Sequence, residues 1–167
     1  ITISGLSGGH SGVMIGNGGA NSNVLSGRIL SALSEVTEFR LSAVFGGFKD
    51  NAIPVSTTIE IVAEDAGKCT EVVSRLCDAF KVEYDVTDPD LCVTIDECKY
   101  VIPFDKSSTQ KIVYLLSIAP NGVQKMSSHI DNLVETSLNF AIVNSFDSKV
   151  EAVFSVRSSV NSQKDML

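Results

Sequence analysis

The residues best suited to chemistry lie in a glycine-rich stretch near the N-terminus, Gly8-Gly9-His10-Ser11-Gly12. Flanking glycines let a backbone turn sharply and approach a ligand closely. A histidine can donate a proton or a hydrogen bond near neutral pH. His10 is therefore the strongest catalytic candidate in the chain. A polar loop histidine without a chemical role is the alternative that these residues leave open.

Two asparagines are candidate substrate-binding residues. Asn51 stands in the run Gly46-Gly47-Phe48-Lys49-Asp50-Asn51-Ala52-Ile53-Pro54, and its amide can both donate and accept hydrogen bonds. Asn139 alternates with apolar neighbours on an expected strand, so its side chain points either into a cleft or to solvent. On local grounds Asn51 could equally be a turn residue that bonds its own backbone.

Arg157 is the third candidate for substrate binding. It ends an expected strand, and its planar guanidinium suits two parallel hydrogen bonds to a carboxylate. A surface ion pair with Glu135 or Glu151 is the plainer alternative.

Other catalytic chemistry has no support in the pattern. The two histidines, His10 and His129, stand in no H-E-x-x-H motif and lie far apart in the sequence, so we expect no metal site in this chain and place His129 in a surface loop. Walker A and dinucleotide-binding patterns are absent from the sequence. The four cysteines form no C-x-x-C pair, and we expect reduced thiols, with a disulfide from Cys98 to Cys77 or Cys92 as the alternative.

Length, net charge and apolar content limit the kinds of protein that this chain can be. A chain of 167 residues can form one domain or two small ones. Its net charge of −7 argues against nucleic acid or an anionic membrane as a partner. No apolar run is long enough to cross a bilayer. The sequence begins without methionine, inside an expected strand, which suggests a fragment of a longer protein.

Hydrophobic periodicity predicts the elements that must position these residues. The order in the first part is strand, loop, helix, two strands of a hairpin, helix and strand, over residues 1–5, 6–22, 23–37, 39–45, 52–63, 66–80 and 91–95. The second part has an extended link, a helix that begins at a Ser107 capping box, a short strand, two longer strands and the opening of a helix, over residues 100–102, 107–118, 122–127, 133–143, 149–157 and 162–167.

These patterns predict an α+β fold. The first part follows the β-α-β-β-α-β order of a ferredoxin-like unit, and the second begins similarly. We therefore expect two ferredoxin-like halves, residues 1–98 and a truncated half at residues 99–167, whose strands join in one antiparallel sheet with helices packed on one face.

Four motifs in this order also resemble the lid, or dimerisation, domain of the M20 metallopeptidases, in particular the aminoacyl-histidine (Xaa-His) dipeptidase branch. They are the His10 loop, the Asn51 run, Leu133-Val134-Glu135-Thr136-Ser137-Leu138-Asn139 and Ser155-Val156-Arg157-Ser158-Ser159. The resemblance extends over nearly the whole chain.

The resemblance implies a role for each candidate. In these enzymes the lid histidine, matched by His10, stabilises the oxyanion of the tetrahedral intermediate, and in dimers it reaches the neighbouring subunit's site. The lid asparagine, matched by Asn51 or Asn139, and the arginine, matched by Arg157, bind the substrate. The two zinc ions belong to a catalytic domain that nothing here matches.

The sequence is therefore interpreted as the lid of a cytoplasmic di-zinc dipeptidase that hydrolyses Xaa-His dipeptides. We expect the fragment alone to bind no zinc and to be inactive. Its expected partners are the dipeptide, the catalytic domain of the same chain and, in a homodimer, a second copy. A stand-alone small-molecule-binding domain and a pure oligomerisation domain are the alternatives.

Overall fold

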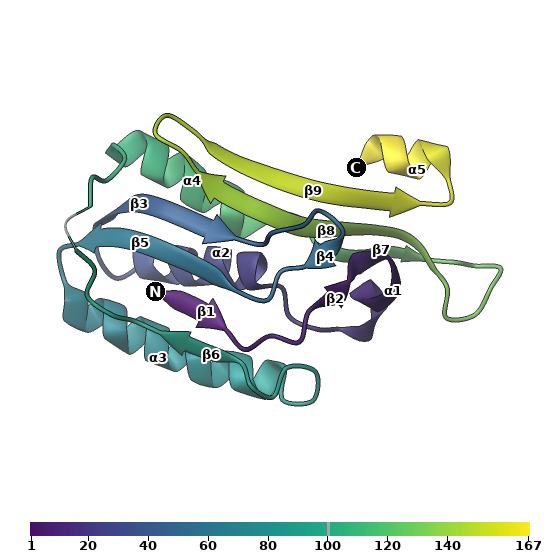
Figure 1. The fold of residues 1–167 in the computed structure, drawn as a ribbon, viewed down its shortest axis with the longest axis horizontal. Helices are drawn as coiled ribbons and strands as arrows, with labels where there is room; N and C mark the ends of the chain where they lie inside the picture. The colour runs from purple at the N-terminus through teal and green to yellow at the C-terminus, as the bar shows by residue number, and fades with distance from the viewer. Residues whose placement is uncertain (100) are drawn as a thin grey trace.

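A computed structural model describes residues 1–99 and 101–167 of the chain (Figure 1). Within these residues seven strands form one antiparallel sheet, and two further strands form a separate pair. The elements are β1 (Thr2–Ser4), β2 (Gly9–His10), α1 (Ser11–Met14), η1 (Ile15–Asn17), α2 (Ser22–Ser34), β3 (Phe39–Gly46), β4 (Ala52–Ile53), β5 (Thr57–Ala63), α3 (Ala66–Glu83), β6 (Cys92–Thr94), α4 (Lys106–Ile118), β7 (Gly122–Met126), β8 (Val134–Ser145), β9 (Val150–Ser158) and α5 (Asn161–Met166).

The main sheet joins the two parts of the chain. Its order is β6-β1-β5-β3-β8-β7, with β9 paired to β8 as well. The junction is the short β3–β8 pairing, where Phe45 lies opposite Asn144 and Gly46 opposite Val143. The α+β class and the antiparallel sheet are confirmed. The division into two ferredoxin-like halves at residue 98 stays a prediction.

Helices α2, α3 and α4 cover one face of this sheet. Side chains that share a sheet face lie opposite each other in register, as Ile3 and Val93 do, and Val44 and Ile59. All four are buried against these helices, in two neighbouring apolar clusters. The helical residues of the clusters include Leu25, Ile29, Leu30, Leu33, Cys69, Val72, Val73, Cys77, Phe80, Val113 and Leu116. The apolar spacing that predicted the helices is thus the spacing of their buried faces.

The predicted loop over residues 6–22 is wrong in part. It contains β2, α1 and η1, none of which is long enough to show periodicity. The predicted arm over residues 52–63 is two strands: β4 pairs with β2, and only β5 pairs with β3. Pro54, which has no N–H for a sheet ladder, lies between them and accepts a hydrogen bond from Ser22 N–H.

Helix ends also differ from expectation. Helix α2 ends at Ser34 instead of residue 37, and α3 continues to Glu83. Asp105, not Ser107, caps α4 by accepting a hydrogen bond from Ser108 N–H at 2.9 Å. Val101 and Ile102 form no strand, and Tyr100 lies outside the described residues.

Helices α2 and α4 cross closely at Gly27. A Cβ on this residue would lie 2.2 Å from the carbonyl oxygen of Leu116. Gly27→Ala should therefore destabilise the protein by about 1–3 kcal/mol, because the overlap outweighs the better helix propensity of alanine. Urea unfolding measures the difference.

Gly67→Ala is the matched control for this prediction. It makes the same change in the first turn of α3, where the nearest atom is a side-chain oxygen of Asp65 at 3.3 Å. A Gly27→Ala protein as stable as the Gly67→Ala protein would contradict the close crossing.

Helices α2 and α3 are linked by an ion pair. Arg28 donates two hydrogen bonds to Glu83, at 2.6 and 2.7 Å, and its guanidinium lies over the ring of Phe80. The hydrogen bond from Arg28 lowers the pKa of the Glu83 carboxyl. Both side chains are about 40% exposed, so solvent screening limits the stabilisation to about 1 kcal/mol or less.

This stabilisation should depend on pH. A lowered pKa in the folded state adds stability above the unfolded pKa of Glu83, and the addition is lost as pH falls through the folded pKa. Glu83→Gln should thus cost up to about 1 kcal/mol at pH 7, and its difference from the unmodified protein should shrink toward about pH 3. Urea unfolding over this range checks the trend, with Glu71→Gln, exposed on the same helix, as control. A difference that stays constant with pH would contradict it.

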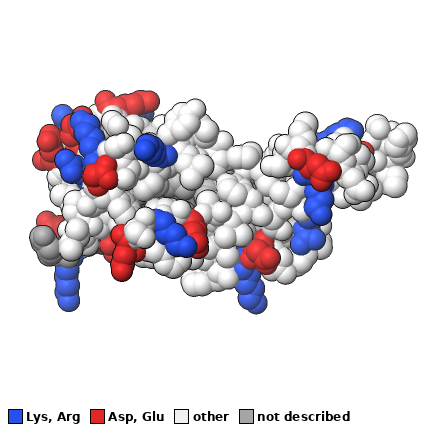
Figure 2. All heavy atoms as spheres, turned by 90° about the horizontal axis from the view of Figure 1, so that it is seen from above, with Lys and Arg blue, Asp and Glu red and all other residues white. Residues whose placement is uncertain are grey.

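The remaining features are the distribution of charge on the surface and the state of the four thiols. Figure 2 shows basic and acidic side chains interspersed on one face, without a broad area of either sign there. Among the described residues no helix has the length and apolar character needed to cross a membrane. Cys69, Cys77, Cys92 and Cys98 are free thiols, as expected for reduced cysteines.

Candidate functional site

His10 lies on a short two-stranded ribbon formed by β2 and β4. It is opposite Ala52, and Gly9 is opposite Ile53. The ribbon requires glycine before the histidine, since Gly8 and Gly9 have φ angles of 65° and 126° that other residues rarely adopt. The backbone N–H of Ser11 donates to the carbonyl of Asn51 at 2.9 Å, so the His10 and Asn51 stretches lie side by side.

The hydrogen bonding of His10 determines which ring nitrogen can act as a donor. Its Nδ1 accepts a hydrogen bond from Gly12 N–H at 3.1 Å and so caps α1. In the neutral ring the proton is therefore on Nε2. The side chain is exposed, and Nε2 has no hydrogen-bond partner within the described part of the chain. His10 thus presents an N–H donor to whatever lies in front of it.

Arg157 reaches the same place from β9. A Cβ on Gly12 would lie 3.0 Å from Cε1 of His10 and 3.1 Å from Cζ of Arg157, so both side chains approach one point. Arg157 is exposed, and no carboxylate in residues 1–99 and 101–167 lies within ion-pair distance of it. The alternative of a surface ion pair is not observed, because Glu135 pairs with Lys125 and Glu151 with Lys149.

The two candidate asparagines differ in exposure. The side chain of Asn51 is exposed beside the ribbon. Asn139 is only 1% exposed, and its amide donates to the carbonyls of Ala52 at 2.8 Å and Asp50 at 3.4 Å. Asn139 therefore lies beneath the turn that presents Asn51 and fastens that turn to β8.

A further asparagine joins this buried contact to the helical layer. Asn21 caps α2 by accepting hydrogen bonds from the N–H groups of Asn23 and Val24. Its amide donates to Asn121 at 3.0 Å and to Asn139 at 3.4 Å. These hydrogen bonds run from α2 through Asn139 to β4 and so support the ribbon.

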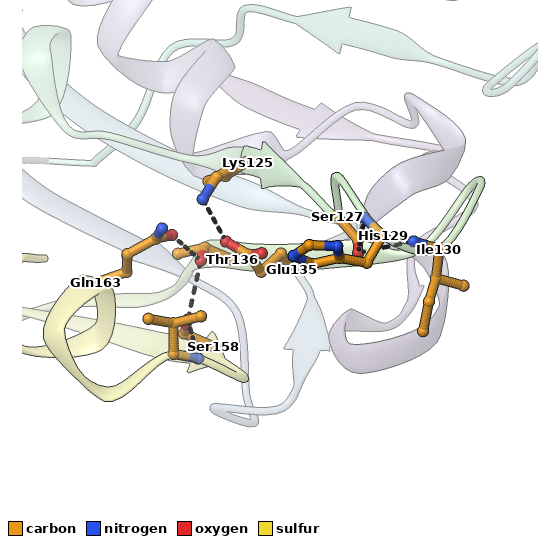
Figure 3. A network of polar contacts seen from close by, with 9 residues as sticks. Lys125, Ser127, His129, Ile130, Glu135, Thr136, Ser158 and Gln163 are labelled. Carbon is orange, nitrogen blue, oxygen red and sulfur yellow. Dashed lines mark hydrogen bonds and ion pairs between the residues drawn. The ribbon is translucent and has the colours of Figure 1, made fainter.

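The second histidine lies apart from this group. His129 is in the exposed hairpin between β7 and β8, where its backbone N–H donates a hydrogen bond to Ser127 Oγ at 3.2 Å. The predicted surface loop is therefore confirmed. Figure 3 shows the neighbouring contacts, in which Lys125, Ser158 and Gln163 converge on Glu135 and Thr136. The hydrogen bond from Lys125 lowers the pKa of the Glu135 carboxyl. This network attaches α5 to β8 and β9 and does not include His10.

Comparison with known proteins finds two dipeptidases that are similar to this chain. No protein-family model matches the sequence. The cytosol non-specific dipeptidase of Escherichia coli (strain K12) is 33% identical over 172 residues, which span 99% of this chain and 35% of that protein. The crystal structure of aminoacylhistidine dipeptidase from Vibrio alginolyticus superposes with a TM-score of 0.95 at 30% identity, over 99% of this chain and 34% of that one.

The chain is homologous to a segment of the M20 dipeptidases. The resemblance to the M20 peptidases seen in the motifs is thereby confirmed, and the relatives are peptidase hydrolases, while the role of this chain as a lid stays a prediction. The segment spans about a third of the length of the relatives it matches.

Residues of the types that bind a metal ion form no group of three or more in the part of the chain that the structure describes. The chemistry that this segment can supply is hydrogen-bond donation and anion binding, from His10, Asn51 and Arg157.

Sequence reasoning missed one buried residue near the site. Asp88, between α3 and β6, is 1% exposed and accepts hydrogen bonds from backbone N–H groups on both sides of the His10 loop. Thr87-Asp88-Pro89-Asp90 has the composition of a turn, and nothing in it indicates partners 68 and 81 residues away.

Proposed function

We propose that this chain is the lid of a di-zinc dipeptidase that hydrolyses Xaa-His dipeptides, with His10, Asn51 and Arg157 facing the substrate. The observation that supports this most is the approach of His10 and Arg157 to one point, where, among the described residues, neither the Nε2 of His10 nor the guanidinium of Arg157 has a partner. A dipeptide has one carbonyl to be attacked and one terminal carboxylate, which these two groups complement.

In this proposal the lid residues stabilise negative charge on the substrate. The two zinc ions would belong to the catalytic domain outside this chain and supply an activated water. The Nε2–H of His10 donates to the carbonyl oxygen as negative charge develops there. Arg157 binds the terminal carboxylate through paired hydrogen bonds. Closure of the lid excludes water and so strengthens both interactions.

The two asparagines have different roles in this proposal. The exposed amide of Asn51 is the one we assign to the substrate, because it can donate and accept in front of the ribbon. The amide of Asn139, with its hydrogen bonds to Ala52 and Asp50, supports that position from beneath.

The setting of the enzyme is part of the same proposal. We propose a cytoplasmic location because the Escherichia coli relative is a cytosol dipeptidase. Partners would be the dipeptide, the catalytic domain of the same protein and, in a homodimer, a second copy of the chain. Nucleic acid and membranes are not proposed as partners, in keeping with the net charge of −7.

The proposal is tested by comparing residues 1–167 alone with the full-length protein. Zinc content and hydrolysis of an Xaa-His dipeptide are measured for both. We expect two zinc ions and turnover in the full-length protein, and neither in the isolated chain. Zinc or turnover in the isolated chain would contradict the lid assignment. Tight binding of a metabolite by the isolated chain would favour a stand-alone binding domain.

A further inference from the structure

We propose that Asp88 is a positioning residue that clamps both ends of the His10 loop and so sets where the imidazole lies. This inference rests on the proposed role of His10. It assigns a function to a buried carboxylate that neither touches the substrate-facing groups nor forms an ion pair among the described residues.

The two oxygens of Asp88 have separate partners. Oδ1 accepts a hydrogen bond from Ser7 N–H at 2.8 Å. Oδ2 accepts one from Ala20 N–H at 2.8 Å and one from the Thr87 hydroxyl at 2.8 Å. Ser7 precedes β2 and Ala20 follows η1, so one carboxylate joins the start and the end of the segment that contains His10.

The carboxylate is itself fixed to the helical layer. Asp88 N–H donates to the carbonyl of Tyr84 at 2.8 Å, directly after α3, and its own carbonyl accepts from Leu91 N–H at 3.0 Å. The Ser7 hydroxyl adds a hydrogen bond to the carbonyl of Thr87 at 2.7 Å. The clamp therefore transmits the position of a helix packed in the core to the ends of the loop.

The chemistry of the clamp requires a carboxylate. Burying a charge is costly unless hydrogen bonds satisfy it, and here three donors do so. A carboxylate accepts on both oxygens, whereas asparagine would turn an N–H₂ group toward either Ser7 N–H or the Ala20 and Thr87 donors. Asp88→Asn thus keeps the shape of the side chain and breaks one end of the clamp.

Little else fixes the loop between its ends. Of residues 8–19 only Ser11 is buried. The ribbon formed with β4 has two residues in each strand. Without the clamp, the ordering of this glycine-rich segment depends on that ribbon, on the α1 cap, on the hydrogen bond from Ser11 N–H to Asn51 and on contacts of η1 with β7 and β8. A displacement of about 1 Å at a catalytic group can lower turnover about a hundredfold.

The test uses the full-length protein and four variants: Asp88→Asn, His10→Ala, the double variant, and Asp105→Asn as control. Asp105 also accepts a backbone N–H, but at the exposed start of α4, away from the loop. Xaa-His hydrolysis gives kcat and KM, and hydrogen exchange reports protection of the Ser7 and Ala20 amides and of the loop between them. Urea unfolding identifies variants that fail to fold.

We expect Asp88→Asn to speed exchange in the loop and to lower kcat about ten- to hundredfold, with little change in KM. It should lower kcat no further in the His10→Ala background, since it acts through His10. Asp105→Asn should leave turnover and loop exchange unchanged.

Four outcomes would overturn the inference. Unchanged exchange at Ser7 and Ala20 would mean that the clamp does not order the loop. Faster exchange with unchanged kcat, or a full additional loss in the His10→Ala background, would mean that the clamp does not act on His10. If His10→Ala itself left turnover unchanged, the proposed function would fail together with the inference, and the exchange data would still show whether the clamp exists.

Discussion

Replacing His10 by alanine in the full-length protein should lower kcat for Xaa-His hydrolysis by about 100- to 1,000-fold, with KM and oligomeric state little changed. The expected size is that of removing one preorganised donor to an oxyanion, about 3–4 kcal/mol. The effect falls on kcat because the donor meets full negative charge only in the transition state. The N–H that is lost is that of Nε2, since Nδ1 is occupied by Gly12 N–H.

Two comparisons make the His10 prediction specific. His129→Ala removes the other histidine of the chain, in the exposed β7–β8 hairpin, and should leave both constants unchanged. His10→Asn keeps a short polar side chain that can still cap α1 but holds no donor at the position of Nε2, so it should lose nearly as much kcat as alanine. Full activity in His10→Ala, with the oligomer intact, would leave the chain as an oligomerisation or binding domain.

The long helices of this domain could be predicted because each buries one face. In α3, for example, Val72, Val73, Cys77 and Phe80 recur at helical spacing and are all buried. A period of this kind is visible in the sequence whatever the helix packs against. The bounds of β8 and β9 were also predicted to within a few residues, although residues 136–141 of β8 are buried on both faces of the strand.

The ribbon that bears His10 could not be predicted from such a period. Strands of two residues have no alternation to detect, and the pairing of β2 with β4 depends on Pro54 interrupting the hairpin. The family resemblance indicated His10, Asn51, Asn139 and Arg157 as candidates. It did not indicate how deeply each side chain is buried. That Asn139 is buried beneath Asp50 and Ala52 depends on tertiary contacts between β8 and a turn far from it in sequence.

The contacts of Asp88 could not be predicted from the sequence for the same reason. Its partners are backbone N–H groups, and every residue but proline has one. No side-chain pattern around Ser7 or Ala20 marks them as donors to a distant carboxylate. The local signals therefore specify the scaffold, whereas the orientation of the site depends on hydrogen bonds between segments that only the folded chain brings together.

Arg157→Lys in the full-length protein should lower kcat/KM for an Xaa-His dipeptide about 10- to 100-fold, mainly through a higher KM. The expected loss, about 1.5–3 kcal/mol, is that of a hydrogen bond to a charged group. Lysine keeps the positive charge but cannot make the paired, planar contact of a guanidinium with a carboxylate. Among the described residues no carboxylate already occupies Arg157, so the loss cannot come from a broken ion pair within them.

The substrate supplies the deciding comparison for Arg157. A dipeptide whose terminal carboxylate is replaced by an amide lacks the partner of the guanidinium, so the unmodified protein should lose on this substrate about what Arg157→Lys loses on the free acid. The variant should show little further loss with the amide, because the two changes remove one interaction. Arg75→Lys, on the exposed side of α3, is the control and should behave as the unmodified protein does with both substrates. Equal discrimination between acid and amide by Arg157→Lys and the unmodified protein would show that another group binds the carboxylate, and would leave Arg157 to support the His10 loop through its contact at Gly12.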